Sequence, residues 1–311
     1  MKAVRIHEYG HANVLAFEDA PTPSITSSEV LVRVVAASVN PVDWKIREGY
    51  LKVMVTHTMP LTLGWDVSGV ITAIGDAVTR FRVGDAVYSR PDIKRNGTYA
   101  EYVAIQEREV ALKPLSASHV EAASLPLAGI TAWEVLINTA QLSKGQKVLV
   151  HAGSGGVGSL AIQLAKSRGA YVIATTSDKN RAFVKSLGAD EVIDYKTQQL
   201  SEILQDIDIV FDTVGGDVQD SSWSVLKQGG ILVSIVSSPS EDKAKELGVR
   251  CAFVFVEPSA CILEELAKLV ERGELRPIVG VEFGLHDIAK AHALSETGHA
   301  IGKIVLNVGQ P

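Results

Sequence analysis

The feature that most constrains the fold is a glycine-rich turn between a short apolar run and a stretch of helical spacing. Residues 153–158 read GSGGVG and satisfy the pattern G-x-G-x-x-G. The turn follows the apolar run 148–152 and opens a helical pattern that continues through Lys166. Backbone N–H groups at such a helix start can bind a pyrophosphate, so the pattern predicts a dinucleotide site. Its members are Gly153, Ser154, Gly155, Gly156, Val157 and Gly158.

The chain after Lys147 alternates short apolar runs with helical stretches. The runs read KVLVHA, YVIATTS, EVIDY, DIVFDTV and ILVSIV. Strands that alternate with helices imply right-handed crossovers and a parallel sheet covered on both faces. We therefore expect an α/β fold with a doubly wound parallel sheet.

Residues before about 115 have a different pattern, with β-type runs broken by turns and little helical periodicity. The pattern changes near Ser118, which we expect to cap a helix together with Glu121. A strand, helix and strand pattern closes the chain, and we expect it to rejoin the first domain. The expected domains are 1–120 with 275–311 returning to it, and 121–274. An amphipathic helix is expected over 259–272.

Composition excludes several classes of protein. The net charge of -6 is mild and the basic residues are scattered, which argues against a nucleic-acid surface. Cys251 and Cys261 are the only cysteines, too few for a disulfide framework or a four-cysteine zinc site. The N-terminus has no leader pattern, and no run reaches the roughly 18 to 20 apolar residues of a membrane helix. These patterns predict a cytoplasmic protein with no membrane partner.

The end of the next apolar run bears on the choice between NADH and NADPH. NAD-selective folds place an acidic residue at this strand tip, where it binds the ribose 2′-hydroxyl. Here the tip is Thr176-Ser177, and Asp178 follows in what we expect to be the first helical turn, with Ser177 as its cap. Hydroxyl and cationic contacts from Ser177, Lys179 and Arg181 favour NADPH. The alternative is that both cations belong to a solvated helix face.

The same region resembles the medium-chain dehydrogenase/reductase superfamily, and within it the quinone oxidoreductase (zeta-crystallin-like) branch. The resemblance rests on Gly145-Gln146, Leu149, the turn 153–158, Gln163 and Lys166. It extends over essentially the whole chain through MKAVRI, VNPVDWKIREG, LGWDVSGVI, RVGDAVY, GTYAEYV, AGITAWEVL, SLGADEVIDY and GKIVL. It implies a GroES-like β-barrel domain followed by a Rossmann domain, with the last segment returning to the barrel.

Zinc-dependent members of this superfamily hold a catalytic metal through Cys and His side chains. The positions that resemble those ligands are Asn40, Trp65-Asp66 and Leu127. An amide, an indole, a carboxylate and an alkyl group do not replace thiolate and imidazole ligands in a tetrahedral zinc site. We therefore expect no metal.

The resemblance implies further site residues, each with a structural alternative. Asn40 and Thr131 are similar to positions that line the nicotinamide, although a turn-capping Asn and a helix Thr are the alternatives. Tyr195 is similar to a residue near the adenosine 2′-phosphate, or is a core tyrosine. Tyr50 lies in a loop that faces the substrate, or is an ordinary loop aromatic. Loops under the cofactor are implied at Val214, Gly215, Ser234, Ile235 and Val236.

These observations predict an NADPH-dependent oxidoreductase that passes a hydride to a quinone without a metal. Asn40 would stabilise negative charge on the carbonyl oxygen, and water would supply the final proton. An alkenal, enone or enoyl reductase of the same family is the alternative, because it shares these residues. From another class, an NADPH sensor or a nucleic-acid-binding protein is the alternative, which the mild acidity disfavours.

The apolar run RCAFVFVEP, with Phe253 and Phe255, predicts an edge strand at the end of the Rossmann segment. An exposed apolar edge is a liability unless it is paired or covered. Pairing with the same edge of a second copy satisfies both, so we expect a homodimer.

Overall fold

The alternating pattern after Lys147 folds into a six-stranded parallel sheet. The computed structural model describes residues 1–309. The strands are ordered β11-β10-β9-β12-β13-β14, and every pair in the sheet is parallel. Counted from β9, this is the order 3-2-1-4-5-6 of a dinucleotide-binding fold. The predicted doubly wound α/β architecture is therefore confirmed. The strands are β9 (Lys147–Val150), β10 (Tyr171–Thr176), β11 (Glu191–Asp194), β12 (Ile207–Asp212), β13 (Leu226–Ser234) and β14 (Arg250–Phe253).

The central parallel strands are apolar and buried, as strands covered on both faces must be. Residues Val148–Val150 are fully buried, and every residue of β12 is buried. The helices of this region are α3 (Pro126–Trp133), α4 (Gly156–Ser167), α5 (Arg181–Ser186), α6 (Leu200–Ile203), α7 (Gly216–Ser222) and α8 (Glu241–Leu247).

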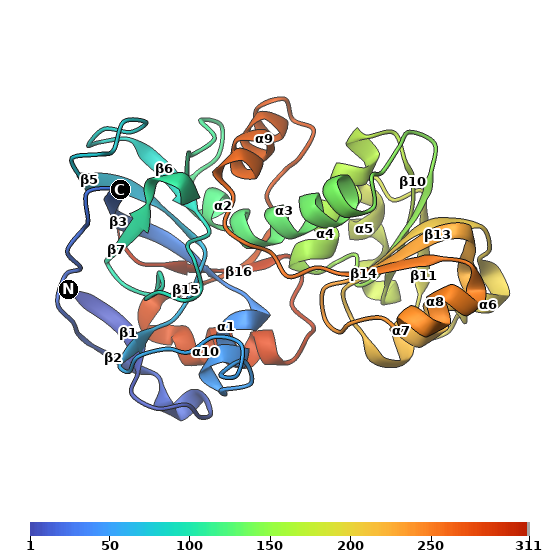
Figure 1. Ribbon diagram of the computed structural model, residues 1–311, viewed down its shortest axis with the longest axis horizontal. Coiled ribbons are helices and arrows are strands. Elements are labelled where there is room, and N and C mark those ends of the chain that lie inside the picture. The colour runs from blue at the N-terminus through green and yellow to red at the C-terminus, as the bar shows by residue number, and fades with distance from the viewer. Residues whose placement is uncertain (310–311) are drawn as a thin grey trace. The chain divides into compact units, whose positions relative to one another are not determined.

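The first part of the chain forms mainly antiparallel sheets that the C-terminal segment completes, with β15 parallel to β16. One sheet runs β15-β16-β3-β5-β6-β8 with β7 also paired to β3, and a second runs β2-β1-β4. Figure 1 shows the red strand β16 among the blue and cyan strands of the N-terminal half, where it pairs with β3. The strands are β1 (Lys2–Ile6), β2 (Ala16–Asp19), β3 (Glu29–Val39), β4 (Leu61–Thr62), β5 (Val67–Ile74), β6 (Ala86–Ser89), β7 (Tyr102–Gln106), β8 (Val110–Leu112), β15 (Val279–Gly284) and β16 (Lys303–Asn307). The helices are α1 (Pro41–Arg47), α2 (His119–Ala123), α9 (Ala260–Glu271) and α10 (Ile288–Glu296).

The chain divides into two compact units. The first comprises Met1–Leu127, Glu257–Arg272 and the segment from Pro277, and the second comprises Ala128–Val256 and Gly273–Arg276. Residues 257–272 join the first unit because α9 packs on it, for example where the Tyr88 hydroxyl binds the Leu263 carbonyl. The sequence analysis instead placed this helix in the second domain, with expected ranges of 1–120 with 275–311, and 121–274. Those domain boundaries stay a prediction.

Local expectations are met at two helix starts. The Ser118 hydroxyl accepts the Glu121 backbone N–H, and the Glu121 carboxylate accepts the Ser118 backbone N–H at 2.8 Å. Ser259 caps α9 through the backbone N–H of Ile262. Among residues 1–309, no helix is long and apolar enough to cross a bilayer.

Candidate cofactor site and buried polar centre

The glycine turn packs so closely against neighbouring atoms that two of its glycines leave no room for a Cβ atom. A Cβ on Gly158 would lie 2.3 Å from the Ala152 carbonyl oxygen, and one on Gly153 would lie 2.9 Å from the Ala174 Cβ. The turn is tied to β10 by the Gly153 N–H, which donates to the Thr175 carbonyl at 2.8 Å. Helix α4 begins at Gly156, so the backbone N–H groups of its first turn have no acceptor within the helix and can bind an anion. This cradle fits a pyrophosphate.

A cluster of polar side chains around the half-buried Ser154 joins the turn to the tip of β10. The Ser154 hydroxyl accepts from the Thr176 hydroxyl at 3.1 Å and from the Asn180 amide at 3.2 Å. Asn180 is 8% exposed and was not among the residues predicted from the sequence. Its signal was an Asn directly before a predicted helix, which is too common to single out.

The tip of β10 carries the residues predicted to distinguish NADPH from NADH. These residues differ in burial and in hydrogen bonding. Ser177 is buried and precedes a 3-10 turn, Asp178–Asn180, instead of capping α5 through its side chain. Arg181 donates to the Asp178 carboxylate at 2.9 Å and to the Val192 carbonyl at 2.6 Å. The Asp178 carboxylate is thereby paired with the Arg181 guanidinium at the surface. Tyr195 is half exposed, and its N–H donates to the Thr176 carbonyl at 3.3 Å, next to the same tip.

The loops after β12 and β13 are fixed by one carboxylate, Asp212. Its Oδ1 accepts the backbone N–H groups of Val214 and Gly215, and its Oδ2 accepts from Ser234 and Gln219. Burial raises the pKa of Asp212, but these four donors outweigh it and hold the pKa below its ordinary value.

Each of these two loops has an exposed apolar side chain, Val214 in one and Val236 in the other. The side chains of Val214 and Val236 are 44% and 39% exposed. They lie at the carboxyl ends of neighbouring parallel strands, where open α/β sheets bind ligands. The sequence analysis named residues of both loops but not Asp212, which orders them, and the contact of these loops with a cofactor stays a prediction.

His151 and Thr131 are both buried in the second unit. The His151 ring lies 2.8 Å from the Ser222 hydroxyl and 3.2 Å from that of Thr175, and burial lowers its pKa to about 4. A neutral ring between two hydroxyls has a structural role. Thr131 is 5% exposed on α3.

In the first unit, a buried carboxylate joins the positions compared above with metal ligands. The Oδ2 atom of Asp66 accepts from the Asn40 amide and from the Ser38 hydroxyl, both at 2.8 Å. Its Oδ1 accepts the Leu127 backbone N–H at 2.7 Å. Asp66 and Ser38 are fully buried and Asn40 is 2% exposed. These three residues and Lys303 are called the polar centre below.

Lys303 supplies the positive charge of the polar centre. Its ammonium donates to Asp66 Oδ2 at 3.1 Å, to the Val39 carbonyl at 3.2 Å and to the Asn40 side-chain carbonyl. The pairing of Ile304 with Val39 on β16 and β3 places Lys303 opposite Asn40. The sequence analysis included Lys303 only as part of the motif GKIVL. Nothing in the sequence distinguishes a buried lysine at the start of a strand from an exposed one.

A second buried carboxylate, Asp43, lies beside the polar centre on α1. Its Oδ2 accepts the Tyr99 hydroxyl at 2.6 Å and the Asn40 backbone N–H at 2.8 Å, while Oδ1 has no partner in the described chain. Burial raises the pKa of Asp43 to about 7 against these donors. Tyr50, by contrast, is 67% exposed and packs its ring edge to face against Trp44.

The side chains of the polar centre do not suit zinc. They are an amide, a carboxylate, a hydroxyl and an ammonium, with no thiolate or imidazole among them. Across residues 1–309, no cluster of three or more His, Cys, Asp or Glu side chains could hold a metal ion.

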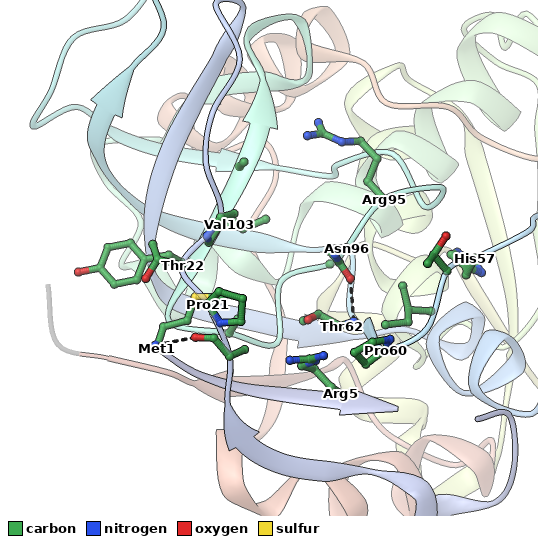
Figure 2. A pocket seen from close by; sticks show the side chains of 18 of the residues that line it. Met1, Arg5, Pro21, Thr22, His57, Pro60, Thr62, Arg95, Asn96 and Val103 are labelled. Carbon is green, nitrogen blue, oxygen red and sulfur yellow. Dashed lines mark hydrogen bonds between the residues drawn. The ribbon is translucent and has the colours of Figure 1, made fainter. Parts of the chain in front are cut away.

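A cavity of the first unit lies away from these residues. It measures about 770 Å³, and its lining includes Arg5, His57, Thr62 and Asn96, which Figure 2 shows around it. None of the predicted site residues lines it.

Comparisons with known proteins agree with both halves of this description. The family model of the alcohol dehydrogenase GroES-like domain matches residues 26–115, and that of zinc-binding dehydrogenases matches 187–306. The chain is 37% identical to the chloroplastic NADPH-dependent alkenal/one oxidoreductase of Arabidopsis thaliana, over 98% of this chain and 79% of the relative. It is 34% identical to the chloroplast envelope quinone oxidoreductase homolog of the same plant, over 98% of each.

Among solved structures, the quinone oxidoreductase from Coxiella burnetii superposes with a TM-score of 0.91 at 38% identity, covering 99% of each chain. The chain belongs to the medium-chain dehydrogenase/reductase superfamily. Within the superfamily it is a quinone and alkenal oxidoreductase homologue, as the resemblance implied, and its first domain is GroES-like. The name of the zinc-binding family model describes that family; the residues of the polar centre in this member do not fit the metal.

Proposed function

We propose that this protein is an NADPH-dependent reductase that passes a hydride to a quinone or to an α,β-unsaturated carbonyl compound without a metal. The observation that carries the proposal is the polar centre, in which Asn40 and Asp66, two of the positions compared with metal ligands, hydrogen-bond to each other and to Lys303. The names of two relatives, an NADPH-dependent alkenal/one oxidoreductase and a quinone oxidoreductase homolog, support the substrate class.

The second unit would hold the cofactor along the carboxyl edge of its sheet. The turn 153–158 would bind the pyrophosphate at the start of α4. Contacts to the 2′-phosphate would come from the β10 tip, with Thr176, Ser177, Lys179, Arg181 and Tyr195. Val214 and Gly215, and the loop Ser234, Ile235 and Val236, would lie under the dinucleotide. Thr131 would contact the nicotinamide.

NADPH, when bound, supplies a hydride from its nicotinamide ring. Asn40 would contact the nicotinamide and stabilise negative charge that develops on the acceptor oxygen. Tyr50 would contact the substrate. Exclusion of water would protect the hydride, and the last proton would come from water at the edge of the site.

Enone reduction is the second candidate for the physiological reaction. The 37% identity to an alkenal/one oxidoreductase favours it as much as the quinone oxidoreductase homologues favour quinones. Steady-state turnover of a quinone panel and an enone panel, with NADPH and after exhaustive chelation, tests the proposal. We expect turnover that chelation leaves unchanged, and a larger kcat/KM for one panel names the reaction. Activity that chelation abolishes and zinc restores would refute the metal-free mechanism.

The assembly and compartment are also proposals. Strand β14 is at the edge of its sheet, with Phe253 and Phe255 about two-fifths exposed at its end, which supports a homodimer joined there. Cys251 and Cys261 are both free thiols, which suits a reducing compartment, and we propose the cytoplasm.

A further inference from the structure

The ammonium of Lys303 has no hydrogen bond left for a ligand. An ammonium has three N–H donors, and those of Lys303 reach Asp66, the Val39 carbonyl and the Asn40 side chain. Its side chain is 6% exposed. Any hydrogen-bonded effect of Lys303 on a bound substrate must therefore pass through one of these partners.

Asn40 is the partner with a donor to spare. Its amide oxygen accepts from Lys303, and one N–H of its Nδ2 donates to Asp66 at 2.8 Å. The second N–H of Nδ2 has no hydrogen-bond acceptor within residues 1–309. A charged donor at the oxygen draws electron density from the amide nitrogen, which makes the remaining N–H a stronger donor.

Two cross-strand relationships hold this arrangement in place. Lys303 lies opposite Asn40 through the β16 and β3 pairing, and Asp66 lies beside Ser38 through the β3 and β5 pairing, where the Ser38 N–H donates to the Asp66 carbonyl at 3.3 Å. The amide of Asn40 is thus clamped between a cation and an anion, so it cannot flip.

We propose that Lys303 is a positioning residue, whose ammonium orients and polarises the Asn40 amide so that its remaining N–H stabilises the oxyanion of the reaction. The assignment rests on the proposed function. In that reaction the nicotinamide is oxidised as its hydride, with its electron pair, forms a C–H bond at the β-carbon of an enone. The alkene π pair shifts, negative charge collects on the oxygen, and a proton from water completes the reduction. For a quinone, the hydride adds to the conjugated ring system, the displaced π pair collects as negative charge on the oxygen, and a proton from water completes the hydroquinone.

A purely structural role makes a different prediction. If Lys303 only neutralises Asp66, then removing both charges restores the protein, because a buried ion pair is replaceable by neutral groups whereas a lone buried carboxylate is not. The decisive variant is therefore the neutral pair Asp66→Asn/Lys303→Met. It keeps the protein testable even where Lys303→Met alone fails to fold.

The experiment measures kcat and KM with NADPH and a saturating enone or quinone, together with the melting temperature. We expect the neutral pair to melt near the wild type and to lose kcat by about 30-fold with KM changed less than about 3-fold, as for an interaction made in the transition state. Lys290→Met, at an exposed lysine that pairs with Asp287, is the matched control and should keep wild-type kcat. Wild-type kcat in the neutral pair overturns the proposal.

A double-mutant cycle shows whether the effect passes through Asn40. In an Asn40→Ala background, adding the neutral pair should lower kcat by less than about 3-fold, because the group it orients is already gone. Full additivity of the two losses overturns the proposal.

A readout independent of turnover separates this inference from the proposed function. In protein labelled with ¹⁵N-asparagine, the Asn40 side-chain resonance is identified by its loss in Asn40→Ala. We expect it to shift in Lys303→Met or the neutral pair and to stay in place in Lys290→Met. An unshifted resonance overturns the positioning role. If the wild type reduces neither substrate panel, the proposed function fails while this measurement still decides the effect of Lys303 on Asn40.

Discussion

The guanidinium of Arg47 lies 3.1 Å from Nδ1 of His292 and joins α1 to α10, helices that are about 245 residues apart in the sequence. Arg47 is fully buried and also pairs with Glu296 at 2.9 Å, which balances its charge. Because the arginine can only donate, Nδ1 must accept, and the ring is neutral. Burial and the neighbouring Arg47 cation lower the pKa of His292 to about 3.

Stability should therefore fall as the pH drops below about 6.5. In the unfolded chain His292 binds a proton near its ordinary pKa, whereas in the fold it does so only near pH 3. The unfolded state thus binds more protons between these values, and the free energy of unfolding decreases by up to about 1.4 kcal/mol per pH unit for this group. His292→Asn, which keeps an acceptor, should flatten the slope in urea unfolding between pH 4 and 7. An unchanged slope would contradict the buried neutral ring.

Asp43→Asn should stabilise the protein at alkaline pH relative to the wild type. The pKa of Asp43 is raised to about 7 in the fold, so the native state holds a proton that the unfolded chain has lost above its ordinary pKa of 3.8. The contribution of Asp43 to stability therefore declines as the pH rises from about 4 to about 7. One amide oxygen can still accept from Tyr99 and from the Asn40 N–H. Melting temperatures at pH 6 and pH 8.5 should diverge in favour of the variant, and equal shifts would show that Asp43 does not titrate there.

Gly158→Ala should lose cofactor affinity by more than about 10-fold, because its Cβ would meet the Ala152 carbonyl at 2.3 Å and push the turn open. Ser167→Ala, at an exposed position in the last turn of the same helix and outside the glycine turn, is the matched control. Calorimetric titration of both variants with NADPH checks this. Equal losses would show that close packing at Gly158 is not what shapes the site.

The β10 tip should set the preference for NADPH over NADH. Ser177→Asp places a carboxylate there, and it should weaken NADPH binding while sparing NADH, because like charges repel in a partly buried site. Lys179→Ala should weaken NADPH alone by up to about 10-fold. Asp178→Asn is the matched control variant, because the Asp178 carboxylate is already paired with the Arg181 guanidinium. Equal affinities of the wild type for the two cofactors in calorimetry would end the prediction.

The sequence predicted what depends on local pattern and left out what depends on long-range pairing. The parallel sheet, the turn 153–158 and the Ser118 cap follow from periodicity and short spacings, and the structure confirms them. Lys303 and Asn40 are 263 residues apart, and only the β16 and β3 register brings them together. Asp66 appeared in the sequence as a missing metal ligand, whereas in the fold it is the acceptor that organises the centre. Asp212 was hidden for the same reason, because its partner Ser234 is on another strand.

The edge strand β14 should join two copies of the chain. It is the last strand of the sheet, as expected from the run RCAFVFVEP, and its free edge has backbone groups that a second copy can pair. Phe253 is 40% exposed at the end of the strand, and Phe253→Glu should turn the dimer into a monomer because a charge is costly at a closed apolar contact. Phe17→Glu, at a phenylalanine 48% exposed on β2 of the other unit, is the matched control and should leave the dimer intact. Light scattering at micromolar concentration measures both. A monomeric wild type rejects the dimer, and a dimer that survives Phe253→Glu and Phe255→Glu rejects this interface.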